Sequence, residues 1–146
     1  MNNQKTNLVH ILLVEDNEGD ILLTSEALEG YKVKTEISIA KNGQEALDFL
    51  FKRGEFMNKK TPDLILLDIN IPIFNGHEVL QKIKADSSLR KIPVIMLTTS
   101  SNQTDIAKAY KSNCNGYIKK PLEIEEFLST ILKIEQFCVE LKILPN

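Results

Sequence analysis

The sequence has few of the residues on which many kinds of site depend. Among its 146 residues there are no tryptophans, two cysteines and two histidines. Cys114 and Cys138 stand far apart and without a nearby histidine pattern, which argues against a thiolate metal site and against a disulfide scaffold. We therefore expect two reduced thiols in a cytoplasmic protein.

Long apolar runs and long runs of one charge are also missing. No stretch approaches the roughly 18 consecutive apolar residues of a membrane span, and the polar N-terminus lacks the apolar segment of a signal peptide. The net charge is −2, from 18 basic and 20 acidic residues, and no run of basic residues is longer than two. Neither a membrane nor nucleic acid is expected as a partner.

What the chain does contain is a regular alternation of two patterns. Short apolar runs predict strands over 8–14, 34–40, 63–68, 93–99 and 116–119. Helical periodicity predicts helices over 17–29, 43–52, 76–85, 102–112 and 123–142. The two patterns alternate five times with no repeat and no flexible linker. This order is typical of a single α/β domain built around a parallel sheet.

Three local features refine this prediction. The run 34–40 alternates between apolar and polar residues and therefore fits an edge strand. The connection 53–62 is polar and rich in turn residues, so we expect a surface loop. Asn17 is a plausible cap for the first helix. That helix has these residues at helical spacing: Ile21, Leu22, Thr24, Ser25 and Leu28.

Polar residues follow the predicted strands where each strand ends. Glu15 and Asp16 follow the first strand, and Asp68 ends the third. Thr98 ends the fourth strand, and Lys120 follows the fifth. Sites in open parallel sheets form beyond the carboxyl ends of the strands, so these side chains are expected to converge. Singly, each has an ordinary explanation as a turn acid, a helix cap, a sheet residue or a solvated lysine.

Together, the three carboxylates, the hydroxyl and the ammonium group suggest phosphoryl chemistry. Three carboxylates in one crevice would raise one another's pKa unless a cation lay among them. Mg²⁺ suits oxygen ligands, and no histidine or cysteine converges that would favour zinc or copper. A lysine and a hydroxyl can bind phosphoryl oxygens. Asp68, on the central strand, is then the best placed nucleophile for an aspartyl phosphate.

Five segments carry a resemblance to a known family. They are LLVEDN (12–17), LILLDINIP (64–72), NG (75–76), PVIMLTTS (93–100) and GYIKKP (116–121). In this order, and over nearly the whole chain, they resemble the receiver domain of two-component response regulators. The resemblance implies a doubly wound, five-stranded parallel sheet of order 2-1-3-4-5, with a flavodoxin-like (CheY-like) fold.

The resemblance also implies roles for residues in these segments. Asp68 matches the phosphoacceptor. Asp16 matches the acid that binds Mg²⁺ directly, and Glu15 the acid that binds it mostly through water. Asn70 matches the position whose backbone carbonyl is a further metal ligand.

A second group of matched positions concerns switching. Thr98 matches the switch hydroxyl and Tyr117 the aromatic residue that changes rotamer with it. Lys120 matches the lysine of the site, which the family places before a cis proline, here Pro121. Gly76 matches a structural glycine.

The implied function is that of a signalling switch rather than an enzyme acting on a separate substrate. A sensor histidine kinase would phosphorylate Asp68. Self-phosphorylation and self-dephosphorylation would be the only reactions of this chain.

The connection 53–62 and the tail also resemble stand-alone receivers of bacterial phytochrome-type kinases. We expect one receiver domain over 1–146, with a core at about 7–133, a helical extension at about 134–146 and no output domain. Signalling would then occur by protein contact with an unidentified target. The surplus apolar stripe of the last helix favours a homodimer over a tail that folds back.

Three other functions compete with this interpretation. A degenerate receiver could serve as a constitutive interaction module. A phosphatase of the haloacid dehalogenase type would need a second aspartate where this chain has Asn70. A flavin carrier would need a phosphate-binding loop where residues 15–20 read EDNEGD, which would repel phosphate. His10 and His77 lack acids at strand ends and are not expected to be phosphotransfer residues.

Overall fold

The computed structural model describes residues 8–29, 35–99, 102–120, 123, 125, 126 and 129. Its elements, in chain order, are β1 (Val9–Val14), α1 (Glu18–Glu29), β2 (Thr35–Ala40), α2 (Gly43–Leu50), the 3₁₀ helix η2 (Gly54–Phe56), β3 (Leu64–Asp68), α3 (Gly76–Ala85), β4 (Val94–Thr98), α4 (Gln103–Lys111) and β5 (Gly116–Lys119). Nine of the predicted elements are therefore confirmed. Most of the tenth predicted helix, and with it Pro121, the extension and its dimer contact, lies outside the described residues.

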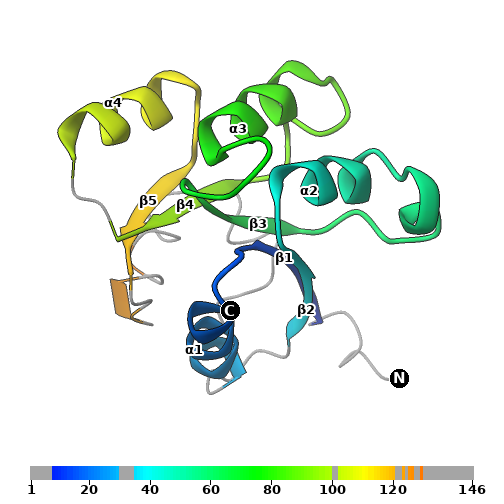
Figure 1. Ribbon diagram of the computed structural model, residues 1–146, viewed down its shortest axis with the longest axis horizontal. Coiled ribbons are helices and arrows are strands. Elements are labelled where there is room, and N and C mark those ends of the chain that lie inside the picture. Colours follow the sequence, from blue (N-terminus) through cyan, green and yellow to red (C-terminus); the bar gives the residue numbers. More distant parts are fainter. Residues whose placement is uncertain are drawn as a thin grey trace.

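The strands form one parallel sheet of order β2-β1-β3-β4-β5, as the resemblance implied (Figure 1). β2 is an edge strand, as its alternating sequence predicted, and Ile37 and Ile39 pack on the same side of the sheet. Because all strands run in one direction, the ends of β1, β3 and β4 lie at the same edge. This topology brings distant polar residues together.

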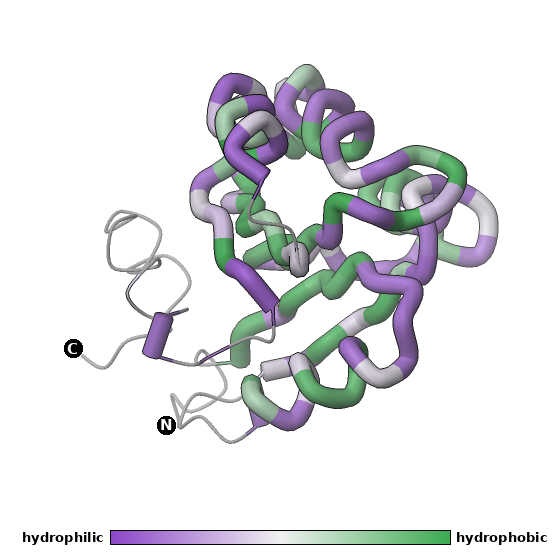
Figure 2. Tube along the Cα trace, turned by 60° about the vertical axis from the view of Figure 1, so that its left-hand side comes forward, coloured by the Kyte–Doolittle hydropathy of each residue, from purple (hydrophilic) through white to green (hydrophobic). Residues whose placement is uncertain are grey.

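Each central strand is buried on both faces. In β1, Leu12 and Val14 pack into the core under α2 and α3, whereas Ile11 and Leu13 face the side that α1 covers. Figure 1 shows α2, α3 and α4 on one side of the sheet and α1 on the other. Figure 2 shows the hydrophobic residues concentrated along the strands between these layers. Two-sided burial explains why these strands are continuous apolar runs.

One local prediction needs correction, and the largely exposed loop 53–62 is confirmed with one added detail. In α1 the packed stripe is Ile21, Thr24 and Leu28, while Leu22 is 58% exposed. Leu22 lies about 100° around the helix from Ile21, so it falls outside the stripe that meets the sheet. The predicted loop 53–62 contains the 3₁₀ helix η2, whose first turn is closed by a hydrogen bond from the Phe56 N–H to the Arg53 carbonyl.

None of the helices in the part of the chain that the structure describes is both long enough and apolar enough to cross a membrane.

Candidate functional site

Three carboxylates meet at the carboxyl ends of β1 and β3. The Glu15 N–H donates to the Ala40 carbonyl at 2.9 Å, which extends the pairing of β1 with β2 by one residue. Asp68 is the last residue of β3. Glu15 and Asp68 are buried, at 1% and 6% exposure, whereas Asp16 is exposed. One carboxylate oxygen from each of the three residues lies within 4.8 Å of the other two.

Lys120 follows β5, the edge strand opposite β2, and its side chain reaches this cluster. Its backbone N–H donates to the Thr98 carbonyl at 2.8 Å, which fixes the chain as it leaves β5. Its Nζ donates to carboxylate oxygens of Glu15, of Asp20 at 2.8 Å and of Asp68 at 3.3 Å. The lysine is therefore the counter-ion of the acids, and it is almost fully buried.

Asp20 is a residue of this cluster that the sequence did not assign to the site. It lies in the first turn of α1, and its N–H donates to the Asn17 side chain at 2.9 Å, the cap predicted for this helix. The cap turns α1 so that Asp20 faces Lys120. The acidic run 15–20 contains Asp20 and could have indicated its role. Its partner Lys120, however, lies 100 residues further along the chain.

Burial and pairing act in opposite directions on the charges of the cluster. Burial raises the pKa of Glu15, while the hydrogen bond from Lys120 lowers it. The neighbouring Asp68 carboxylate raises it further, so the pKa of Glu15 lies above its ordinary value. Burial alone would lower the pKa of Lys120. The carboxylates of Asp20, Glu15 and Asp68 outweigh that effect and raise it. Lys120 is thus held as a cation among acids that outnumber it.

The predicted switch residues lie on the two strands beyond β3. Thr98 is fully buried at the end of β4, next to β3, where Leu97 pairs with Asp68. Tyr117 lies in β5 opposite Met96, is half-buried and packs against the core on the α2 and α3 side. Lys119 is exposed. The structure therefore brings Lys120 to the acids with Thr98 one strand away, and it places Tyr117 further along the sheet.

The loop between β3 and α3 follows Asp68 and is fixed by three hydrogen bonds. The Asn70 N–H donates to the Asp68 carboxylate at 3.4 Å. The Gly76 N–H donates to the Ile69 carbonyl at 2.8 Å, and a Cβ on Gly76 would lie only 2.4 Å from the Asp68 carbonyl oxygen. The Gly43 N–H donates to the Pro72 carbonyl at 3.1 Å, which ties the loop to the start of α2. Gly76 is thus required by a close backbone approach beside Asp68.

The donor set of the cluster fits a hard divalent cation. In the described part of the chain, Glu15, Asp16 and Asp68 form one group of three side chains that could hold a metal ion. All its ligand atoms are carboxylate oxygens, and one member is exposed, which leaves room for metal-bound water. Such ligands suit Mg²⁺ or Mn²⁺ better than zinc or copper.

The two histidines lie away from this cluster. The His10 Nε2 is 2.8 Å from the Ser38 hydroxyl in the neighbouring strand. The backbone N–H of His10 donates to the Asp63 carboxylate. His77 is buried at the start of α3, with its Nε2 3.4 Å from Asp105 of α4. Both positions are those of packed core histidines.

Comparisons with known proteins agree with this geometry. The family described as response regulator receiver domain matches residues 11–132. The chain is 39% identical over 135 residues to the response regulator Rcp1 of Synechocystis sp., covering 92% of each chain. It is similar to the solved structure of the phosphorylated cyanobacterial phytochrome response regulator RcpA, with 43% identity and a TM-score of 0.75. The match covers 88% of this chain and 92% of the RcpA chain. For the Mn²⁺-bound form of Rcp1 the identity is 38% and the TM-score 0.76, with coverage of 94% and 99%.

Proposed function

This chain belongs to the response regulator receiver domains, the phosphoacceptor proteins of two-component systems, and we propose that it accepts its phosphoryl group on Asp68. The observation that carries the proposal is the contact of one lysine with several acids. Asp68 ends the central strand, is buried beside Glu15, and has the Nζ of Lys120 at 3.3 Å. A nucleophile, a cation binding site and a phosphoryl-binding ammonium group are then next to one another.

The reaction forms one bond and breaks another. A carboxylate oxygen of Asp68 attacks the phosphorus of a phosphohistidine on a histidine kinase, and the P–N bond breaks. The electron pair returns to the imidazole, which takes up a proton, and an acyl phosphate remains on Asp68. Glu15, Asp16 and Asp68, with the carbonyl of Asn70, would hold Mg²⁺. When bound, this ion offsets the charge of the carboxylates and of the phosphoryl oxygens.

Lys120 and Thr98 respond to the new group. Lys120 already lies at Asp68, so a small movement away from Glu15 and Asp20 brings its Nζ to a phosphoryl oxygen. The hydroxyl of Thr98, one strand away, donates a hydrogen bond to another phosphoryl oxygen. Its inward movement leaves space that Tyr117 fills, and this changes the surface around α4 and β5. Return to the resting state is hydrolysis of the acyl phosphate by water at the same site.

The partner kinase is of the phytochrome type in this proposal. Its support is the similarity to Rcp1 and to the phytochrome response regulator RcpA. The signal then passes to a target protein in the cytoplasm by contact, and the proposed homodimer through the last helix would present two receivers at once.

The deciding experiment is the intact mass of the protein after incubation with acetyl phosphate and Mg²⁺. We expect a single phosphoryl adduct, lost when a chelator is added and absent in Asp68→Asn. Asp63→Asn is the matched control, because Asp63 lies at the opposite end of β3 and should not affect the adduct.

An adduct that persists in Asp68→Asn would refute the assignment of the phosphoacceptor. If no adduct forms and circular dichroism shows the native fold, the chain acts as a degenerate receiver, a constitutive interaction module.

A further inference from the structure

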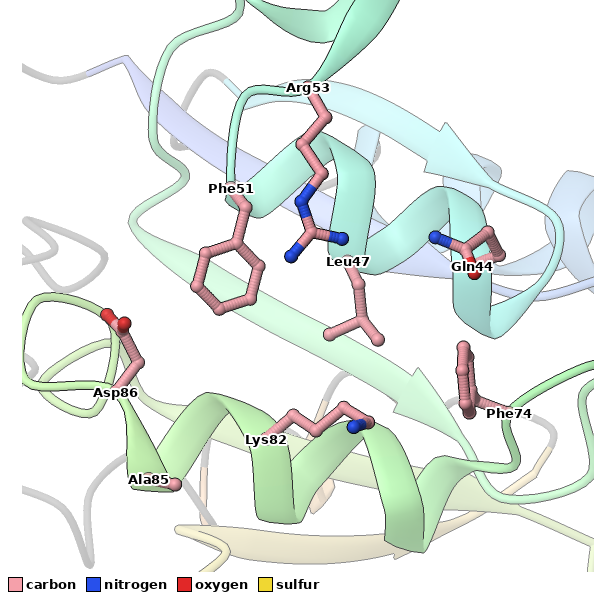
Figure 3. Close-up of a pocket in the computed structure, with 8 residues that line it drawn as sticks. All are labelled: Gln44, Leu47, Phe51, Arg53, Phe74, Lys82, Ala85 and Asp86. Carbon is pink, nitrogen blue, oxygen red and sulfur yellow. The ribbon is translucent and has the colours of Figure 1, made fainter.

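A groove of about 360 Å³ lies between α2 and α3, on the outer side of the layer that covers the sheet (Figure 3). Leu47 forms part of its apolar lining, and the rings of Phe51 and Phe74 stand at its two ends. Both rings are only partly buried and pack against the main core. The groove therefore offers an apolar surface formed by the two helices and by the residues that flank them.

Two cations cover this apolar surface. The Arg53 guanidinium lies 4.8 Å from the centre of the Phe51 ring, and the Lys82 ammonium lies 5.3 Å from the centre of the Phe74 ring. Figure 3 shows Arg53 reaching across from the α2 side, while Lys82 extends along α3 on the opposite wall. Such cation–π contacts hold both charges over the groove instead of leaving them free in solvent.

Asp86, the one acid among the residues that line the groove, is not paired with these cations. Asp86 accepts hydrogen bonds from its own loop, from the N–H groups of Ser88 and Leu89 at 3.0 Å each. Arg53 is 3.4 Å from Asp48, a weak exposed pair. Among the residues that the structure describes, no carboxylate lies within ion-pair distance of Lys82.

The segment that follows α2, to which the groove residue Arg53 belongs, is also positively charged. The segment 52–60 carries four exposed cations, Lys52, Arg53, Lys59 and Lys60, against one acid, Glu55. The whole chain has a net charge of −2, so this positive segment is a local feature. Lys82 has no ion-pair partner among the described residues, and Arg53 has only the weak pair with Asp48. An apolar groove with two such cations is complementary to an acidic ligand with a bulky apolar group.

We propose that the α2–α3 groove is a docking site for an acidic segment of a partner protein that inserts an aromatic side chain between Phe51 and Phe74. A segment of a protein fits better than a free small molecule, because the groove is open and its two cations lie over rings at opposite ends. None of the residues that the phosphorylation chemistry uses lines this groove.

The groove also adjoins the loop that follows Asp68. Phe74 belongs to this loop, and its carbonyl oxygen would be 2.1 Å from a Cβ on Gly43, so the loop and α2 fit together without space to slide. A partner bound against Phe74 therefore stabilises one arrangement of the loop. Docking itself does not depend on phosphorylation, and it can be tested in Asp68→Asn.

The probe is the peptide acetyl-EEWEE-amide, with acetyl-EEAEE-amide and acetyl-KKWKK-amide as controls. Because the chain has no tryptophan, the fluorescence of the two tryptophan peptides reports binding directly. The alanine peptide has no fluorophore, so its binding is measured by competition with the first peptide. We expect saturable binding of the first peptide alone. The affinity for this peptide should be lower by about tenfold or more in the double variant Arg53→Glu/Lys82→Glu, because both charges that attract the peptide are reversed. It should be unchanged in Lys108→Glu, the same charge reversal at an exposed position on α4.

Amide chemical shifts provide the second measurement. The shifts of Leu47, Phe51 and Phe74 should move on titration in the wild type and in Asp68→Asn, and not in the double variant. Equal binding by the double variant, no saturable binding, or binding of the lysine peptide would overturn the proposal. Binding of indole-3-acetate as tight as that of the peptide would also overturn it, because the groove would then take small aromatic acids.

Discussion

At the scale of single residues, the position of Lys120 depends on a competition among carboxylates. Asp20 lies closer to its Nζ, at 2.8 Å, than Asp68 does, at 3.3 Å. Asp20 therefore holds the lysine back from Asp68, the carboxylate that we propose as the phosphoacceptor. In the acyl phosphate the lysine has to leave Asp20, so this contact opposes the reaction.

Asp20→Asn should accelerate phosphorylation by acetyl phosphate. A partly exposed ion pair contributes about 0.2–1 kcal/mol, so its loss predicts a rate constant roughly one and a half to five times higher. The measurement is the rate of adduct formation at saturating Mg²⁺. Glu18→Gln is the control, since this nearby acid pairs with Lys41 and not with Lys120. A slower rate in Asp20→Asn would mean that Asp20 positions the lysine for the reaction instead of competing for it.

Gly76→Ala should destabilise the fold, because the added Cβ would lie 2.4 Å from the Asp68 carbonyl oxygen and 2.7 Å from the Ile69 Cα. Backbone atoms cannot yield as a flexible side chain can, so we expect a cost of about 1–3 kcal/mol. The measurement is thermal unfolding, with Tm lower by roughly 5–10 °C. Gly19→Ala, where the nearest atom is a side-chain oxygen at 3.2 Å, should leave Tm nearly unchanged.

How far the sequence predicts the site depends on the kind of residue. The acids and the lysine could be predicted because strand ends in a parallel sheet share one edge. Asp20 could not, because its role depends on the rotation of α1 and on a partner from β5. The functional roles of Thr98 and Tyr117 remain predictions, since they concern a movement between two states.

At the scale of elements, predicted boundaries differ from the observed ones by at most two residues. Central strands are apolar on both faces and end where polar residues begin, which makes their ends easy to locate. The packed face of α1 was harder. Both Leu22 and Leu28 have helical spacing, and only contact with the sheet decides which one is buried.

The start of α3 is set by a capping box. The Asn75 side chain accepts a hydrogen bond from the Glu78 N–H at 3.0 Å, and the Glu78 side chain accepts one from the Asn75 N–H at 2.9 Å. Asn75→Ala should therefore lower stability by about 1 kcal/mol, measured by urea unfolding. Asn75→Asp is the matched variant. It keeps the acceptor and places a negative charge at the helix N-terminus, so it should be at least as stable as the wild type.

At the scale of the whole molecule, stability should decrease in alkaline solution. Burial raises the pKa of Cys114 from 9.0 to about 11, and it also raises those of Tyr110 and Tyr117. Between pH 9 and 11 the unfolded chain therefore holds fewer protons than the folded protein. Stability that is complete below pH 9 is lost as the pH rises towards 11.

Cys114→Ala should lose less stability than the wild type over this range. The quantity to compare is the change in Tm between pH 8 and pH 10.5 within each protein, which removes the cost of the smaller side chain itself. Lys84, whose pKa burial lowers, acts in the opposite direction and is present in both proteins. Equal changes in Tm would show that the Cys114 thiol does not contribute.

The contact between Glu15 and Lys120 joins residues 105 positions apart in the chain. During synthesis at about 5–20 residues per second, the ribosome adds Lys120 roughly 5–20 s after Glu15. Until the chain beyond β5 has emerged, Asp68 lacks its lysine, although β4, the strand that carries Thr98, has already been made. The acid cluster therefore gains its counter-ion only after all five strands have been made, so the site is among the last parts of the described fold to be completed.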